Sequence, residues 1–213
     1  MAATSTPTDV AGPAGRIEAV IDVPEGASRG VAVLCHPHPV HGGTMDNKVI
    51  QTLARAFVQL GYRAVRFNFR GVGRSQGQWD HGAGEVDDAM AVVAACRDAA
   101  APLVLAGFSF GGYVAAKAAE RLAAAHTAVQ RLVLIGPATS TFPMPVVAPD
   151  SLVIHGEADD VVPLQATLDW ARPQGLPVVV LPGVGHYFHG QLTRLRDLVQ
   201  RGWSTDGSVS RPA

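Results

Sequence analysis

The feature that most constrains this chain is an apolar run that ends in Gly-x-Ser-x-Gly, at residues 103–112. The pattern predicts a strand, a sharp turn and the start of a helix, with Ser109 at the apex. Gly107 and Gly111 lack side chains, so the strand and the helix can approach closely. The serine hydroxyl would stand clear of its own backbone, and the Phe110 amide would face the place where negative charge develops. Ser109 is therefore the candidate nucleophile, with a purely structural glycine-rich turn as the alternative.

Apolar strands and amphipathic helices alternate along the rest of the chain. Strands are expected at residues 16–23, 30–34, 62–69, 103–106, 131–135, 152–155 and 178–181, and helices at 46–60, 85–99, 113–125, 164–171 and 190–201. This alternation is typical of an α/β fold with a mostly parallel central sheet and helices on both faces. Ligands of such sheets bind beyond the C-terminal strand ends, so the loops there are candidate site walls.

Length and composition indicate one domain at residues 16–203, between a flexible N-terminus (1–15) and a flexible C-terminus (204–213) that both lack apolar periodicity. The formal net charge is −1 with only two lysines, which gives no basic face for nucleic acid. Two cysteines are too few for a disulfide framework. The chain shows neither a secretory signal pattern nor an apolar run of about 18 residues. We therefore expect a cytoplasmic protein without a nucleic-acid or membrane partner.

A serine hydroxyl is a weak nucleophile at neutral pH and needs a base, usually a histidine held by a carboxylate. His186 lies in a glycine-rich loop directly after the last expected strand. Three acids, Glu157, Asp159 and Asp160, lie in the loop after the preceding strand. The order serine, acid, histidine is that of the α/β-hydrolases.

The chain resembles the α/β-hydrolase superfamily over residues 30–201. The resemblance rests on Gly-x-Ser-x-Gly, on His-Gly-x-x-Asp-x-x-Val-Pro at residues 155–163 and on Gly-x-Gly-His at 183–186. Three longer segments are similar to a bacterial subgroup of small, lidless serine hydrolases: LCHPHPVHGGTMDNK at 34–48, RFNFRGVGRS at 66–75 and GAGEVDD at 82–88. The resemblance implies an α/β-hydrolase fold without a cap domain, and a serine hydrolase that needs no cofactor.

The resemblance also implies roles for single residues. The acid in this superfamily is the first residue of Asp-x-x-Val-Pro, which assigns it to Asp159 and leaves Asp160 as an exposed neighbour. Matching residues 36–37 onto the usual His-Gly turn assigns one amide of the oxyanion hole to the backbone N–H of His38. The other oxyanion amide is that of Phe110.

Two patterns have a second interpretation. His36, His38 and His41 could be metal ligands, but their spacing is loose and no cysteine or carboxylate accompanies them. Gly71 and Gly73 follow a strand as in a dinucleotide-binding motif, yet the third glycine is out of place and the next segment is a loop. We therefore expect neither a metal nor a nucleotide.

Two further segments bear on the surroundings of the site. Arg70 lies near the end of a buried strand and needs a partner there, which Glu85 or Asp88 at the next helix N-terminus can supply. Residues 136–149 contain four prolines and cannot form a helical cap of useful length.

These residues predict ester hydrolysis, in which Ser109 attacks an acyl carbonyl, His186 transfers the proton and Asp159 orients His186. Loop aromatic and apolar residues could line a pocket for short acyl chains: Val40, Trp79, Phe108, Phe142, Met144, Val161 and Tyr187. The triad does not distinguish esters from thioesters, lactones or amides. A binding protein that has lost its chemistry is the alternative from another class, although such a loss usually removes a triad member. The expected partner is a small ester or thioester, and the expected assembly a monomer or homodimer.

Overall fold

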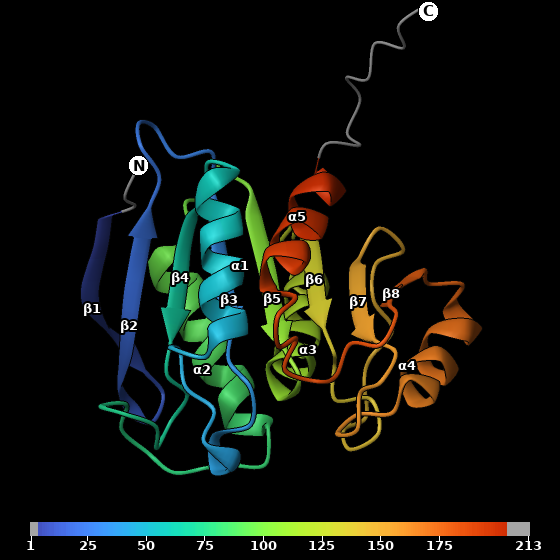
Figure 1. The fold of residues 1–213 in the computed structure, drawn as a ribbon. Helices are drawn as coiled ribbons and strands as arrows, with labels where there is room; N and C mark the ends of the chain where they lie inside the picture. Colours follow the sequence, from blue (N-terminus) through green and yellow to red (C-terminus); the bar gives the residue numbers. More distant parts are fainter. Residues whose placement is uncertain (1–3, 204–213) are drawn as a thin grey trace, which may run out of the picture.

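The computed structural model describes residues 4–203. Its centre is an eight-stranded sheet in the order β1-β2-β4-β3-β5-β6-β7-β8 (Figure 1). The strands are β1 (Thr4–Gly12), β2 (Gly15–Val23), β3 (Val31–Cys35), β4 (Arg63–Phe67), β5 (Leu103–Phe108), β6 (Arg131–Ile135), β7 (Leu152–Gly156) and β8 (Val178–Leu181). The β1–β2 and β2–β4 pairs are antiparallel, and β4, β3 and β5 to β8 pair in parallel.

Helices cover both faces of this sheet, as Figure 1 shows. One face carries α1 (Lys48–Gln59) and α5 (Leu192–Trp203), and the other carries α2 (Ala83–Cys96) and α3 (Phe110–Ala124). The remaining helices are α4 (Leu164–Ala171) and the short 3-10 helices η1 (Pro39–His41) and η2 (Arg172–Gln174). The three-layered α/β fold is thus confirmed, and the expected strands and helices lie within a few residues of the observed ones.

Strand β5 divides the core into two apolar clusters. All of its residues are buried. Leu103 and Leu105 pack toward α2 and α3, whereas Val104, Ala106 and Phe108 pack toward α1 and α5, as the alternation of side chains along a strand requires. Each large apolar side chain buried in this way contributes about 1.5–3 kcal/mol. The strand that leads into Ser109 is therefore packed on both of its faces.

The N-terminal segment differs from the sequence prediction. We expected residues 1–15 to be flexible, but Thr4–Gly12 forms β1 and pairs with β2 along its whole length. Most of β1 is exposed, with Val10 as its buried residue. An edge strand of this kind is held by backbone hydrogen bonds, so it needs no apolar periodicity and tolerates Pro7. The expected flexible C-terminus at 204–213 lies outside the described residues.

The connection between β6 and β7 contains no helix over residues 136–151. Hydrogen bonds tie it to the neighbouring helices α4 and η2. The indole N–H of Trp170 donates to the Pro145 carbonyl at 3.0 Å, and the Val147 amide donates to the side chain of Gln174 at 3.0 Å. This segment therefore forms no cap over the sheet.

Within residues 4–203, no helix has both the length and the apolar character needed to cross a membrane.

Candidate active site

Ser109 lies on a sharp turn between β5 and α3. Its backbone has φ 55° and ψ −118°, a left-handed conformation that strains residues other than glycine. A Cβ atom at Gly107 would lie 2.0 Å from the Gly111 carbonyl oxygen, and one at Gly111 would lie 2.0 Å from that of Cys35. The strand and the helix therefore approach as closely as the two glycines predict. The Ser109 amide anchors the turn by donating to the Ile135 carbonyl at 2.9 Å.

Asp159 and His186 form a buried hydrogen-bonded pair. Nδ1 of His186 lies 2.7 Å from Oδ2 of Asp159, while Oδ1 accepts the amides of Val161 at 3.0 Å and Val162 at 2.7 Å. Burial alone raises the pKa of Asp159, but the hydrogen bonds from His186, Val162 and Val161 outweigh it and hold the pKa below its usual value. Asp159 is therefore ionised at neutral pH. Because Nδ1 of His186 donates to it, Nε2 of the neutral imidazole is left as the acceptor.

The pair lies beside the serine turn, at the C-terminal ends of β5 to β8. The ring of Phe108, which precedes Ser109, lies 4.9 Å from the ring of His186 between centroids. Gly136 follows β6 with φ 45°, and a Cβ there would lie 3.5 Å from Oδ2 of Asp159 and 3.6 Å from Nδ1 of His186. The Ser109 side chain makes no hydrogen bond to the start of α3. Its hydroxyl is therefore not occupied as a helix cap.

The two amides predicted for the oxyanion hole belong to residues at helix starts. Phe110 is the first residue of α3, and its N–H has no acceptor within that helix. His38 is the N-cap residue of η1, where its Nδ1 accepts the Val40 amide at 3.3 Å. The close contact of Gly111 with the carbonyls of Cys35 and His36, at the end of β3, brings the loop that contains His38 against the start of α3.

His36 holds this loop in place with both of its ring nitrogens. Nδ1 lies 2.6 Å from the Pro37 carbonyl and therefore donates to it, and Nε2 accepts the Phe69 amide at 3.1 Å. Burial lowers the pKa of His36 to about 4, although the bond to Pro37 opposes the shift. The ring is thus neutral, and neither nitrogen is free for a metal. The rings of His38 and His41 stack 4.4 Å apart at 20°.

The predicted pocket residues fall into two groups. Val40, Val161 and Tyr187 are exposed by 63%, 50% and 51%. Each lies one or two residues along the chain from His38, Asp159 or His186, and we call these three exposed apolar side chains the apolar rim. Phe108 differs from these three because it is fully buried in the core, with its ring beside that of His186. Met144 is half-buried against the core.

The half-buried Trp79 and Phe142 belong to an aromatic cluster on the other side of the serine turn. Trp79 lies 4.6 Å from the His38 ring and 5.0 Å from the Phe110 ring, and Phe142 lies 5.1 Å from Phe110. Tyr113 stacks on Phe142 at 4.9 Å. Sequence reasoning missed Tyr113 and the ring of His38. The spacing of Tyr113, one helical turn after Ser109, was the available signal.

Arg70 forms an internal ion pair with Asp88, one of its two predicted partners. Its guanidinium donates to both Asp88 oxygens, at 2.8 and 3.0 Å. Glu85 instead accepts the Asp80 and Gly82 amides at the start of α2. A Cβ at Gly73 would lie 2.5 Å from the side chains of Asn68 and Glu18, so this turn packs against the sheet.

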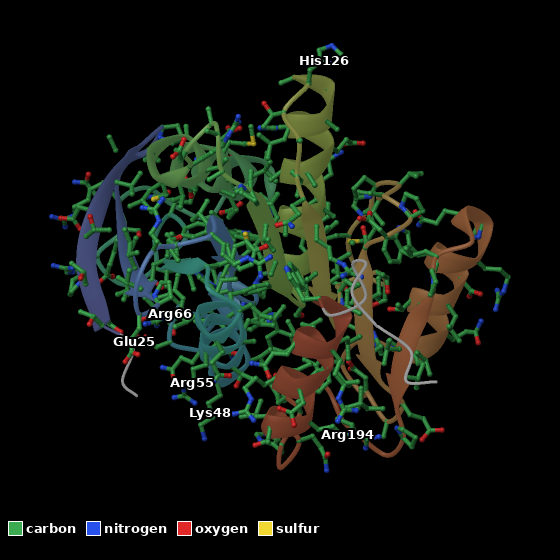
Figure 2. The ribbon with its side chains drawn as sticks, turned by 90° about the horizontal axis from the view of Figure 1, so that it is seen from above. Glu25, Lys48, Arg55, Arg66, His126 and Arg194 are labelled. Carbon is green, nitrogen blue, oxygen red and sulfur yellow. The ribbon has the colours of Figure 1, made fainter. Side chains whose placement is uncertain are left out.

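The two cavities described for the molecule lie away from Ser109. The larger, about 820 Å³, is lined by Glu25, Arg55 and Arg66, which Figure 2 shows on the α1 side. The smaller, about 410 Å³, lies at the far end of α3 near His126, which Figure 2 shows on the opposite side.

Comparison with known proteins agrees with this architecture. The family model described as serine aminopeptidase, S33, matches residues 29–150, a span that contains Ser109 but ends before Asp159. An uncharacterized protein of Rickettsia prowazekii is 34% identical over 164 residues, which cover 71% of this chain and 66% of that protein, slightly under two thirds of its length.

Two solved structures are also similar. One is a lidless α/β serine hydrolase of Xanthomonas campestris, with a TM-score of 0.87, 39% identity and 97% of both chains covered. The other is an α/β serine hydrolase homologue of Coxiella burnetii, with a TM-score of 0.79, 40% identity and coverage of 92% of this chain and 96% of that one. With the family match over more than half of its residues, the chain therefore belongs to the serine aminopeptidase S33 family of the α/β-hydrolase superfamily.

Proposed function

We propose that the chain hydrolyses short-acyl carboxylic esters through a covalent acyl-enzyme, with Ser109, His186 and Asp159 as its triad. The observation that carries this proposal is the strained turn at Ser109 beside the buried Asp159–His186 pair. A serine at such a turn, with a histidine whose tautomer is held by a carboxylate, is the arrangement that activates a hydroxyl.

In the proposed reaction, Nε2 of His186 accepts the Ser109 proton while Oγ bonds to the acyl carbon. The amides of Phe110 and His38 hold the negative charge on the carbonyl oxygen. The tetrahedral intermediate collapses as His186 returns the proton to the leaving alkoxide, which departs as the alcohol. Water then attacks the acyl-enzyme by the same steps, and releases the carboxylic acid and free Ser109. The ionised Asp159 stabilises the imidazolium that forms twice in each cycle.

Aminopeptidase activity is the second candidate, because the matched family carries that description. An aminopeptidase must bind the α-ammonium group of its substrate, which calls for a carboxylate at the site. Glu157 already accepts the Gly183 amide at 2.8 Å, and Asp80 lies 3.8 Å from Arg70. Asp160, which is exposed, would have to bind the α-ammonium group.

The leaving group also favours esters. An ester needs less acid assistance than an amide because its leaving group is less basic, so we place esters first, with thioesters and lactones as close alternatives.

Covalent labelling tests the proposal. A fluorophosphonate should add one label to the intact protein, detected by mass, and Ser109→Ala should abolish it while lowering kcat on p-nitrophenyl butyrate by a factor on the order of 10⁴. Ser140→Ala, at an exposed serine of the 136–151 connection, is the matched control and should label normally. Wild-type protein that takes no label would make the chain a binding protein. Faster turnover of amino-acid p-nitroanilides than of esters, lost in Asp160→Asn, would favour the aminopeptidase.

A further inference from the structure

A second histidine lies on the far side of the proposed triad acid. His155 is the fourth residue of β7 and is fully buried. Its Nε2 lies 2.9 Å from the Val162 carbonyl and 3.4 Å from Oδ2 of Asp159. Oδ2 is also the atom that accepts Nδ1 of His186. The mechanism above does not use His155, yet its ring contacts the same carboxylate oxygen as His186.

The hydrogen bonds around His155 determine which nitrogen carries its proton. Burial lowers the pKa of His155, against the opposing influence of Val162 and Asp159, so the ring is neutral at neutral pH. A carbonyl can only accept, so Nε2 must donate to Val162. Nδ1 is then the acceptor for the Thr167 hydroxyl, 3.2 Å away, and Thr167 accepts in turn from the Thr139 hydroxyl at 2.9 Å. The two threonines thus hold the Nε2–H tautomer.

This tautomer acts on Asp159 in two ways. The Nε2–H group fixes the Val162 carbonyl, and the amides of Val162 and its neighbour Val161 are the donors to Oδ1 of Asp159. The nitrogen that carries this proton, Nε2, lies 3.4 Å from Oδ2, and a polar N–H group so close favours the ionised carboxylate in a buried setting. Both oxygens of Asp159 therefore depend on the His155 ring, one through the loop and one directly.

We infer that His155 is a positioning residue for the triad, which holds the Asp159 carboxylate in the orientation that directs His186 toward Ser109. Thr167 and Thr139 support it by fixing its tautomer. They come from α4 and from the connection after β6, so the acid is braced by three segments that meet behind it. This inference rests on the proposed function.

Two substitutions separate this role from simple packing. His155→Leu fills similar space without a donor and should lower kcat on p-nitrophenyl butyrate by roughly 10- to 100-fold, as for other groups that orient a reacting side chain, with KM within about twofold. His155→Gln can still donate an N–H to Val162 and should keep kcat within about threefold. Thr52→Val is the matched control, since Thr52 is also buried but donates to the Lys48 carbonyl inside α1, and its kcat should not change.

A double-mutant cycle tests whether the effect passes through Asp159. If His155 acts by orienting that carboxylate, His155→Leu should change kcat by less than about twofold in an Asp159→Asn background. A full additional loss in that background, or a Gln variant as slow as the Leu variant, would assign His155 to packing and overturn the inference. If the Leu variant does not fold, Thr167→Val retains the imidazole and should still lower kcat by about three- to tenfold, and an unchanged kcat there overturns the inference equally.

The same experiments separate this inference from the proposed function. If Asp159→Asn itself leaves kcat unchanged, the triad assignment has failed. If Asp159→Asn is slow and labelling of Ser109 persists while His155→Leu is fully active, only the role of His155 has failed.

Discussion

Asp159 and Asp160 are neighbours in the chain with opposite surroundings. Asp159 is 7% exposed and accepts His186 and two amides, whereas Asp160 is exposed. Asp159→Asn should lower kcat on a short ester by up to about 10⁴-fold, because an amide holds the wrong tautomer of His186. Asp160→Asn, the matched control, should change kcat by less than about threefold. Steady-state kinetics of both variants measures these changes. A lower kcat for Asp160→Asn than for Asp159→Asn would contradict the assignment of Asp159 as the triad acid.

The buried ring of His36 makes stability depend on pH. Its pKa falls from 6.5 to about 4 in the folded state, so the unfolded chain binds more protons between these values. The resulting stability, about 3 kcal/mol, is present above pH 6.5 and is lost as the pH falls toward 4. The lowered pKa of His155 acts in the same direction.

Urea unfolding of wild type and His36→Gln measures this contribution. The variant should be less stable than wild type at pH 7.5, and the gap should narrow by about 2–3 kcal/mol at pH 4.5, because glutamine does not titrate. His189→Gln, at an exposed histidine, is the matched control for the loss of an imidazole ring. A gap for His36→Gln that stays constant with pH would show that His36 takes up its proton equally in both states.

At the residue scale, chain order and motif spacing predicted much of the candidate site. Turn chemistry alone locates a serine between glycines, acids in the loop after the next-to-last strand and a histidine in the loop after the last strand. Side-chain direction could not be read in the same way. Phe108 is one residue before Ser109 yet points into the core, and His155 is set behind Asp159 by contacts with α4. Such contacts join segments distant in sequence, so no local pattern reports them.

At the scale of elements, the Arg70–Asp88 pair joins the turn after β4 to α2. The side chains are 11% and 1% exposed, so removing the cation leaves a buried carboxylate uncompensated, at a cost of about 3–5 kcal/mol. Arg70→Met should therefore lower Tm by roughly 10 °C and leave KM for a short ester unchanged. Arg74→Met is the matched control, since Arg74 is 58% exposed in its pair with Glu18, and should shift Tm far less. Calorimetry measures Tm, and steady-state kinetics measures KM. A normal Tm with a raised KM for Arg70→Met would place Arg70 in the substrate site.

Elements with a buried face were predictable, and the edge strand was not. The apolar residues of α1 keep helical spacing, and β5 is apolar throughout, so burial left a pattern in both. Strand β1 buries little and is held by its pairing with β2. Its polar, threonine-rich sequence resembles that of a flexible terminus, because the backbone bonds that hold it are the same for any residue.

At the scale of the whole molecule, no helical cap covers the proposed site within residues 4–203. The connection at residues 136–151 has no helix and is tied to Trp170 and Gln174, and the apolar rim of Val40, Val161 and Tyr187 is at least half exposed. Each methylene of a substrate that stays in water forgoes about 0.8 kcal/mol. On p-nitrophenyl esters, kcat/KM should therefore peak at acyl chains of roughly two to six carbons, without a rise at the micellar threshold.

A chain-length series checks this, with Tyr187→Ala as a probe of the rim. The variant should lose most on the longest acyl chain that the wild type prefers and least on acetate, since acetate is too short to reach the rim. A kcat/KM that continues to rise through about twelve carbons would require a covered tunnel in place of an open rim.

The left-handed backbone at Ser109 means that the protein holds this serine at the expense of its own stability. A non-glycine residue in such a conformation costs on the order of 1–3 kcal/mol. Glycine usually destabilises a protein relative to alanine, by about 0.4–1 kcal/mol, but at φ 55° the order should reverse. Ser109→Gly should therefore unfold at a higher temperature than Ser109→Ala, and the inactive protein would be the more durable one. Selection for stability alone would remove the serine, so its presence on this turn points to a requirement other than folding.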